Sequence, residues 1–469
     1  MKSTSLFKSL SLLVFLNFLV KPVWILFIDR QVQNSVGQEA YGSYFAILNL
    51  SIVLSFIADA GLTNMVNQQL ASGTAFSLKQ IIRYKVFLSL LYVGLVFSVA
   101  SFSGLKNWFL ISGVVFIQLL TSYLVLLRNI ITAHQYFGTD AWLSVIDKGL
   151  MILLAGSFIY LPVFAGINVR LFLTIQIICT TFSILIAVFI LNKKKISTKG
   201  QVIGFAKIIQ AMLPFSVIIL LMGMHYRLDG FLLNLLYTNG AYETGVYAGA
   251  YRLLDASNMV GYLAASFIVP FIAKNKSNIL LVEETIHSLR HLLLLGCAVL
   301  VTFTLVFAPE LQQLLYHNNN AHNISVLQLC LMALPGYFLV HIYGSLLTAT
   351  NQLRTFIAIT TLAVLLNIVL NLLLIRTYGA AGCCVAAIAS QSFCGLACFI
   401  IGSKKTGIQL SLKTMFLYII SAIGLYFIFY WGKNAALNYW LLFGLGSFMV
   451  LLILFTQIAY FRKLFFNFR

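Results

Sequence analysis

Residues 212–261 read MLPFSVIILLMGMHYRLDGFLLNLLYTNGAYETGVYAGAYRLLDASNMVG. Two apolar segments in this stretch are each long enough to span a bilayer, and each carries ionisable residues away from its ends. Charges at membrane depth are costly, so by default they face a protein interior or a water-filled path. Pro214 and the Gly/Ala-rich start of the second segment predict helices that bend and pack closely. The stretch therefore predicts a transport cavity.

The composition of the whole chain predicts an all-α polytopic membrane protein. Of the 469 residues, 61% are hydrophobic and only 9% are charged, whereas soluble domains contain roughly 25% charged residues. Strands of a membrane barrel alternate apolar and polar residues over about ten positions, but the apolar runs here continue for about twenty. The first run continues to Ile28 and is too long for a signal peptide, so we expect a transmembrane helix there.

The formal net charge of +19 has a topological explanation. Most of the 30 Lys and Arg residues fall in loops on one side of the predicted helices, as the positive-inside rule requires, with attraction to membrane lipids as a second effect. No basic stretch is interleaved with aromatic residues in a sizeable loop, so we expect no nucleic-acid partner. The seven cysteines all fall in predicted helices, where we expect neither disulfides nor metal ligation.

Hydropathy over a window of about 19 residues predicts fourteen helices. An even number puts both termini on one side, and the basic loops, including one with Lys79, Arg83 and Lys85, identify that side as the cytoplasm. All connections are short and leave no room for a soluble catalytic domain, so we expect no enzyme activity. The predicted helices are 6–29, 41–66, 82–103, 108–134, 141–162, 168–192, 209–236, 244–272, 288–308, 323–350, 355–376, 381–402, 414–431 and 439–461.

A basic and polar link over 193–208 divides the first twelve helices six and six. We therefore predict a first six-helix lobe over 1–192, a second over 209–402, and a further two-helix hairpin with a basic tail over 403–469. Two short correspondences support a repeat. Gly42-Ser-Tyr44 and Gly245-Val-Tyr247 each open the second helix of a half, and Thr132-Ala-His-Gln135 and Thr348-Ala-Thr-Asn351 each end the fourth.

Four cations lie within predicted helices at membrane depth. Lys21 shares a helix face with Asn17, and Pro22 follows it directly. Snorkelling to the headgroups is the alternative for Lys21. Because the cations outnumber nearby acids, we predict a cavity that holds an anionic group such as a pyrophosphate through guanidinium forks. The candidate residues for this cavity are Lys21, Arg128, Arg227 and Arg252.

Acidic residues in the helices are candidates for ion coupling or gating. Asp29 and Arg30 are expected to end the first helix at the outer surface, where an interfacial ion pair is the alternative. Asp59 continues a polar stripe begun by Ser51 and Ser55 at a spacing of four, near the inner end of the second helix. An interfacial position is the alternative for Asp59.

Local spacing makes different predictions for two charge pairs. Arg252 and Asp255 are three apart, so a self-neutralised structural pair is the alternative to a binding role. Asp147 and Lys148 are adjacent, point about 100° apart on a helix and need not pair. The candidates for coupling or gating are Asp29, Arg30, Asp59, Asp147, Asp229 and Asp255.

Several loose motifs resemble the bacterial polysaccharide-biosynthesis flippases of the Wzx type. They span nearly the whole chain and are mainly apolar. They are Asp29-Arg30, Gly37 and Tyr41-Gly-Ser-Tyr44; Ala58-Asp-Ala-Gly-Leu62; Leu213-Pro214, Asp229, Gly245-Val-Tyr247 and Ala250-Tyr-Arg252; Tyr343-Gly-Ser-Leu-Leu-Thr-Ala-Thr-Asn351; Asn367-Ile-Val-Leu-Asn-Leu-Leu-Leu-Ile375; and Tyr378-Gly-Ala-Ala-Gly382.

The resemblance implies the multidrug/oligosaccharidyl-lipid/polysaccharide (MOP) exporter superfamily, with two six-helix lobes around a central cavity that opens alternately to either face. The Wzx-type branch flips undecaprenyl-pyrophosphate-linked oligosaccharides across the bacterial inner membrane, for O-antigen and hence lipopolysaccharide, capsule or exopolysaccharide biosynthesis. The resemblance further implies transport coupled to a proton or sodium gradient, and work beside a polysaccharide polymerase and chain-length regulator. We expect no cofactor, because the sequence contains no phosphate-binding loop, paired-glycine nucleotide motif or zinc spacing. Nothing in the sequence requires an oligomer, so we expect a monomer.

Three other functions remain as alternatives. A multidrug or toxin cation antiporter has the same fold but would favour acidic residues for its substrates. A peptidoglycan-precursor flippase is another relative that a cationic cavity does not exclude. A membrane-embedded polysaccharide polymerase, from a different class, would normally need a sizeable outward loop, and the longest one expected here is the short connection from Pro309 to His322.

Overall fold

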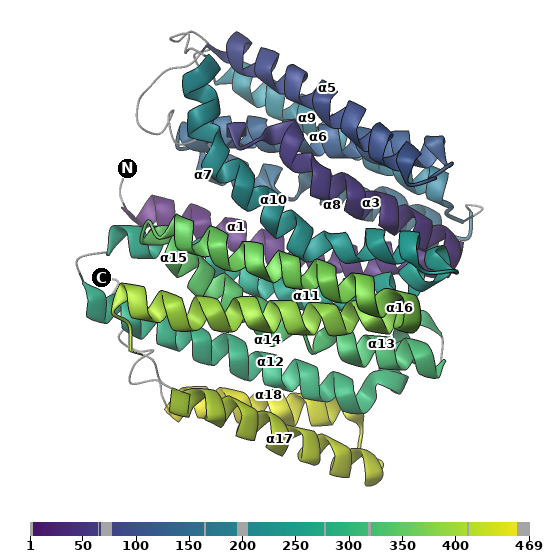
Figure 1. Cartoon of the computed structure of the whole chain (residues 1–469), viewed down its shortest axis with the longest axis vertical. Helices are drawn as coiled ribbons and strands as arrows, with labels where there is room; N and C mark the ends of the chain where they lie inside the picture. The colour runs from purple at the N-terminus through teal and green to yellow at the C-terminus, as the bar shows by residue number, and fades with distance from the viewer. Residues whose placement is uncertain are drawn as a thin grey trace. The chain divides into compact units, whose positions relative to one another are not determined.

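A computed structural model describes residues 3–63, 65–66, 77–163, 166–194, 205–275, 278–317, 320–409 and 412–456. Every regular element within these ranges is helical, either α or, over two short segments, π. The chain divides into two compact units, Met1–Gly245 and Val246–Arg469, and helix α11 continues from the first unit into the second. Figure 1 shows the helices along the chain.

The first unit is built from long helices that pack side by side. Within it α10 packs along α3, α6 along α9, and α5 against α3. Its elements are α1 (Ser3–Val23), η1 (Trp24–Asp29), α2 (Arg30–Val36), α3 (Gln38–Asp59), α5 (Leu78–Phe102), α6 (Trp108–Ala133), α7 (Phe137–Leu143), α8 (Ile146–Tyr160), α9 (Val169–Lys193), α10 (Phe205–Leu236) and the start of α11 (Gly240–Lys274).

The second unit has α12 at the centre of its contacts. Helices α13, α14, α17 and α18 all pack against α12, and α17 lies beside α18. Its elements after α11 are α12 (Ile279–Tyr316), α13 (Ala321–Leu331), α14 (Leu334–Leu339), η2 (Val340–Gly344), α15 (Ser345–Ala349), α16 (Leu353–Thr406), α17 (Leu412–Asn434) and α18 (Tyr439–Thr456).

The predicted all-α polytopic membrane fold is confirmed. Among the described residues, 12 helical segments are long and apolar enough to cross a membrane, and Tyr439–Leu451 is a shorter apolar helix. One of the 12 is α16, whose 54 residues would reach about 80 Å at 1.5 Å per residue, far beyond one bilayer. Counting α16 as two spans and adding α18 reproduces the fourteen predicted segments.

Hydrogen bonds identify α16 as a helical hairpin. The backbone leaves helical geometry at Gly379, with φ 55° and ψ −130°, a conformation that glycine tolerates and other residues rarely adopt. Asn367 Nδ2 donates to Ser390 Oγ at 3.3 Å, and Lys405 Nζ donates to Thr355 Oγ1 at 2.6 Å. Both pairs lie nearly symmetrically about Gly379, so the two halves run antiparallel, as the separate predictions 355–376 and 381–402 require.

The predicted end of the first helix is wrong. After Pro22, which lacks an N–H, the helix widens into the π segment η1 and continues through α2 to Val36. Asp29 is therefore inside a continuous helical span and only 2% exposed, rather than at an exposed helix end. Arg30 Nε donates to the carbonyl of Leu26, 2.8 Å away within η1.

Other predicted boundaries differ in detail. The predicted helix 141–162 is divided between α8 and a separate short helix, α7, that starts earlier. The predicted helix 323–350 is divided into α13, α14, η2 and α15. The compact units divide at Gly245, whereas the predicted seam at 193–208 falls within the sequence range of the first unit. The six-plus-six lobes and their boundaries stay a prediction.

Two glycines bring the starts of α3 and α11 into backbone contact. A Cβ added to Gly42 would collide with the carbonyl oxygen of Ala241, and one added to Gly245 would collide with that of Gln38. Gln33 Nε2 also donates to the Gly245 carbonyl at 2.8 Å. The two short motifs that were paired in the sequence, Gly42-Ser-Tyr44 and Gly245-Val-Tyr247, thus meet at their glycines, because only glycine allows such close approach.

We expect Gly42→Ala to lower the thermal unfolding midpoint of the purified chain, because the added methyl group would force the two helices apart. The matched control is Gly94→Ala in α5, where a Cβ meets no heavy atom within 4 Å. Overpacking of this kind typically costs about 1–3 kcal/mol. Equal unfolding midpoints for the two variants would contradict the close contact.

Candidate functional site

A cluster of five charged side chains joins helices α1, α6, α7 and α8 of the first unit. It contains the cations Lys21, Arg128 and Lys148 and the acids Asp140 and Asp147, and we call it the cationic cluster. Its net formal charge is +1, from three cations and two acids. The sequence predicted roles for Lys21, Arg128 and Asp147 within this group, and those roles stay predictions.

Arg128 forms the shortest ion pair of the cationic cluster. Its Nε and Nη2 atoms donate to the two oxygens of Asp140 at 2.7 and 3.2 Å, a bidentate arrangement. Asp140 lies in α7 with its side chain 7% exposed, against 24% for Arg128. Asp140 was missed in the sequence because it stood just before the predicted helix 141–162, where it could have faced water.

Asp147 and Lys148 are paired, although their adjacent positions on a helix did not require it. Lys148 Nζ lies 3.5 Å from Asp147 Oδ2, because the long lysine side chain reaches back around the first turn of α8. The same ammonium lies 5.2 Å from the ring centroid of Trp24 in η1, within the range of a cation–π contact. These contacts tie the start of α8 to η1.

Lys21 provides the remaining positive charge. The charges that act on its ammonium are those of Arg128, Asp147 and Lys148. Among the described residues no carboxylate oxygen lies within 4.0 Å of Lys21 Nζ. Asn17, which the sequence placed on the same face, donates through Nδ2 to Ser144 Oγ at 2.7 Å and so holds this face of α1 against the segment between α7 and α8.

A second ion pair, Asp59 with Lys85, lies near the ends of α3 and α5. The prediction that Lys85 sits in a cytoplasmic loop is wrong, because Lys85 is in α5 with its side chain 0% exposed. Its ammonium donates to Asp59 Oδ1 and to Ser122 Oγ, each at 2.6 Å. Asp59 also accepts a hydrogen bond from the Thr63 hydroxyl. Asp59, itself half-buried, therefore pairs with a fully buried lysine, and the pair joins α3, α5 and α6.

The other candidate residues lie in α10 and α11. Arg227 is half-buried and Asp229 is 2% exposed, both in α10. In the second unit, Arg252 Nη1 lies 3.7 Å from Asp255 Oδ2 in α11, the local pair that the spacing of three residues offered as an alternative. The spacing thus anticipated this contact correctly. A binding role for either residue stays a prediction.

Arg290 is a buried cation that the sequence interpretation missed. It lies in α12 and is 1% exposed. Its guanidinium donates to the hydroxyls of Tyr418, Tyr343 and Thr414 at 3.3, 3.1 and 3.2 Å, and its Cζ lies 5.7 Å from the ring centroid of Phe399. The available signal in the sequence was its place two residues before the apolar run that begins at Leu292.

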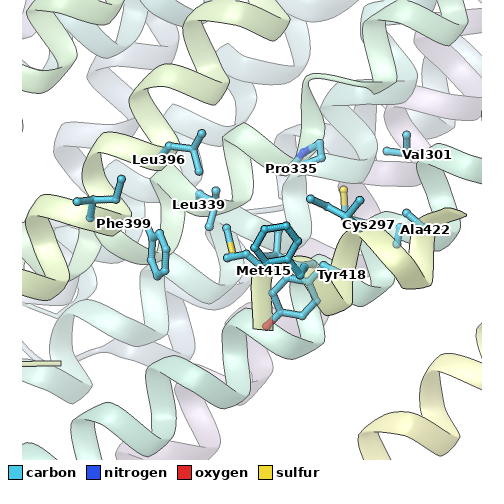
Figure 2. Close-up of a pocket in the computed structure, with 14 residues that line it drawn as sticks. Cys297, Val301, Pro335, Leu339, Leu396, Phe399, Met415, Tyr418 and Ala422 are labelled. Carbon is cyan, nitrogen blue, oxygen red and sulfur yellow. The ribbon is translucent and has the colours of Figure 1, made fainter. Parts of the chain in front are cut away.

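An apolar pocket of about 420 Å³ lies beside Arg290 in the second unit. Residues of α12, α14, α16 and α17 line it, and Figure 2 shows their side chains gathered around the space. Tyr418 and Phe399 belong both to this lining and to the surroundings of Arg290. The pocket volume is within the range of small-molecule sites, about 300–1,000 Å³.

Known proteins resemble this chain in structure but not detectably in sequence. No protein-family model and no curated protein sequence matches it. A solved structure of the lipid II flippase MurJ, in an inward closed conformation, superposes with a TM-score of 0.68 over 98% of this chain and 99% of that chain, at 14% identity. This chain has the fold of MurJ.

Transporters of the MOP superfamily share that fold. An inward-facing multidrug resistance MATE transporter has a TM-score of 0.62 at 15% identity, covering 82% of this chain and 94% of that one. A MOP superfamily transporter from Pyrococcus furiosus, described as having a binding pocket of reverse polarity, has a TM-score of 0.64 at 14% identity, covering 87% and 98%. These proteins are transporters or flippases. The likeness establishes the fold, and the substrate of this chain is a separate question.

We expect Lys85→Met to destabilise the chain strongly, because it leaves the Asp59 carboxylate without its cation. Breaking a buried ion pair typically costs about 3–5 kcal/mol. The measurement is the thermal unfolding midpoint of the purified chain, and Lys79→Met, which changes an exposed lysine of the same helix, is the control. The double variant Lys85→Met/Asp59→Asn should recover part of the loss. If Lys85→Met and the control Lys79→Met have the same unfolding midpoint, the ion pair does not stabilise the fold.

Proposed function

We propose that this chain flips a polyprenyl-pyrophosphate-linked oligosaccharide from the inner to the outer leaflet of a bacterial inner membrane by alternating access. The observation that carries the proposal is the cationic cluster. Three cations face two acids there, and among the described residues Lys21 has no carboxylate within 4.0 Å. An excess of positive charge at membrane depth favours an anionic ligand, and a pyrophosphate supplies one.

The fold is compatible with a lipid-linked substrate. The same fold occurs in a protein described as a lipid II flippase and in a protein described as a multidrug resistance transporter. A lipid-linked oligosaccharide of the O-antigen, capsule or exopolysaccharide type combines an anionic group, a sugar chain and an apolar tail. The cationic cluster would hold the first of these. The polymerase and the chain-length regulator that use such a product are the partners we propose.

Ion coupling is part of the same proposal. Asp29 and Asp229 are each 2% exposed within helices of the first unit. A buried carboxylate in a membrane helix is a candidate for proton or sodium coupling. We assign Asp29 and Asp229 this role ahead of Asp59, Asp147 and Asp255, because those three are only half-buried.

A multidrug cation antiporter is the second candidate, favoured by the MATE structures and by the same two buried carboxylates. The two functions differ in the charge of the ligand. An antiporter for cationic drugs would depend on Asp29 or Asp229, and loss of Lys21 would not weaken it. A flippase for a pyrophosphate-linked lipid would lose rate when Lys21 is neutralised.

We expect Lys21→Ala to slow translocation of a fluorescent polyprenyl-pyrophosphate oligosaccharide by about tenfold or more, equivalent to about 1.4 kcal/mol of activation free energy. The measurement uses the purified chain in proteoliposomes and an impermeant reagent that reports which leaflet holds the lipid. Lys21→Arg should retain most of the rate because it keeps the charge. Lys106→Ala, which changes an exposed lysine before α6, is the control.

Three outcomes distinguish the candidates. A rate lost in Lys21→Ala and kept in the other two variants supports the flippase. Equal translocation rates in all variants would show that the cationic cluster does not bind the substrate. No lipid transport by the unmodified chain, together with uptake of a cationic dye driven by a proton or sodium gradient, would establish the antiporter instead.

A further inference from the structure

The second unit contains a buried arginine whose hydrogen-bond partners are all neutral. The Arg290 guanidinium donates to three hydroxyls, and its Cζ lies over the aromatic ring of Phe399. Among the described side chains no carboxylate oxygen lies within 4.0 Å of Arg290. The titratable neighbours of Arg290 in α12 are His287 and His291, and His287 Nε2 in turn lies 4.0 Å from Glu283 Oε1.

A buried arginine without an acidic partner is stabilised by a bound anion. Arginine stays protonated in proteins, and removal of a charge from water is costly unless an opposite charge accompanies it. Hydroxyl groups satisfy the N–H donors of Arg290 but do not neutralise its charge. In membrane helices such a residue is a functional-site candidate by default.

Arg290 lies at the boundary between polar and apolar sequence in α12. Before it come Glu283, Glu284 and His287, and after His291 the sequence is apolar from Leu292 through Val301. On α17 the boundary lies at the same level, because Thr414 contacts Arg290 while Phe416 and Ile419 beyond it are 66% and 56% exposed to the surroundings of the helix. Both helices start at the predicted cytoplasmic side, so Arg290 lies at headgroup depth.

The apolar pocket extends from this boundary toward the predicted middle of the membrane. Along α12 its lining runs from Leu294 to Val301, and along α17 from Met415 to Ala422. Phe416 and Ile419 belong to the lining and are exposed, so the pocket is open to acyl chains of the bilayer. One end of the pocket is therefore cationic and the rest is apolar, which matches the two parts of a phospholipid.

We propose that this pocket binds an anionic phospholipid of the predicted cytoplasmic leaflet, with one acyl chain in the pocket and the phosphodiester beside His291 and Tyr418. Arg290 is too buried to touch the headgroup directly. It acts through its field and through the Tyr418 hydroxyl, to which it donates at 3.3 Å and which lies 2.8 Å from His291 Nδ1.

Charge balance favours a phosphodiester over the transported substrate at this site. One phosphodiester carries a single negative charge and matches the single permanent cation, Arg290. A pyrophosphate carries more negative charge than this one cation offsets. The lipid site therefore does not depend on the proposed flippase function.

Native mass spectrometry of the purified full chain tests the proposal, with phosphatidylglycerol and phosphatidylcholine of identical acyl chains offered together. We expect the unmodified chain to retain phosphatidylglycerol with about a tenfold preference, equivalent to about 1.4 kcal/mol. Arg290→Gln and His291→Gln should reduce that preference severalfold or more. Ala422→Trp, which fills the pocket, should abolish the binding of both lipids.

Ile420→Trp is the matched control, because Ile420 neighbours the pocket residues on α17 but is 63% exposed and outside the lining. If Arg290→Gln does not fold, His291→Gln and Ala422→Trp still decide the question. Equal retention of the two lipids by the unmodified chain would overturn the headgroup assignment. Equal binding by Ala422→Trp and Ile420→Trp would overturn the pocket. Displacement of phosphatidylglycerol by an equimolar polyprenyl pyrophosphate would assign the pocket to the transported lipid instead.

Discussion

A charge removed from water must be paired, hydrogen-bonded or matched by a ligand, and this constraint explains much of how the helices of this chain meet. Asp59 and Lys85 join α3 to α5, and Ser122 extends the contact to α6. Arg128 and Asp140 join α6 to α7. Apolar packing alone specifies helix neighbours poorly inside a membrane, because lipid tails are as apolar as leucine. The buried charges therefore fix which helices lie together and at what register.

The same constraint separates balanced from unbalanced sites. Asp59 with Lys85 is a neutral pair, and so is Arg252 with Asp255. The cationic cluster and the surroundings of Arg290 each keep one positive charge more than the described acids offset. A neutral pair is complete within the protein. A site with a surplus charge is where a ligand of opposite charge adds the most stability.

Helix positions could be predicted from the sequence because a span is a local property, a run of apolar residues of a fixed length. Even the α16 hairpin was anticipated, since the hydropathy falls around Tyr378 and Gly379. Ion partners could not be predicted in the same way. Lys85 and Asp59 are 26 residues apart, and Arg290 and Tyr418 are 128 apart. Only the tertiary packing brings such residues into contact. The pair of Arg252 and Asp255 could be predicted because the two residues are three apart on one helix.

At each of the two π segments, a change to α geometry would rotate the following part of the helix and turn a different face toward its neighbours. A π turn closes i→i+5 hydrogen bonds and so accommodates one residue more than an α turn. If η2 tightened to α geometry, everything beyond it would turn by about 100° about the helix axis. Tyr343 would then leave Arg290, and a shift of η1 would likewise carry Trp24 away from Lys148. Each π segment thus contains one residue more than an α turn would, and each contacts a cation.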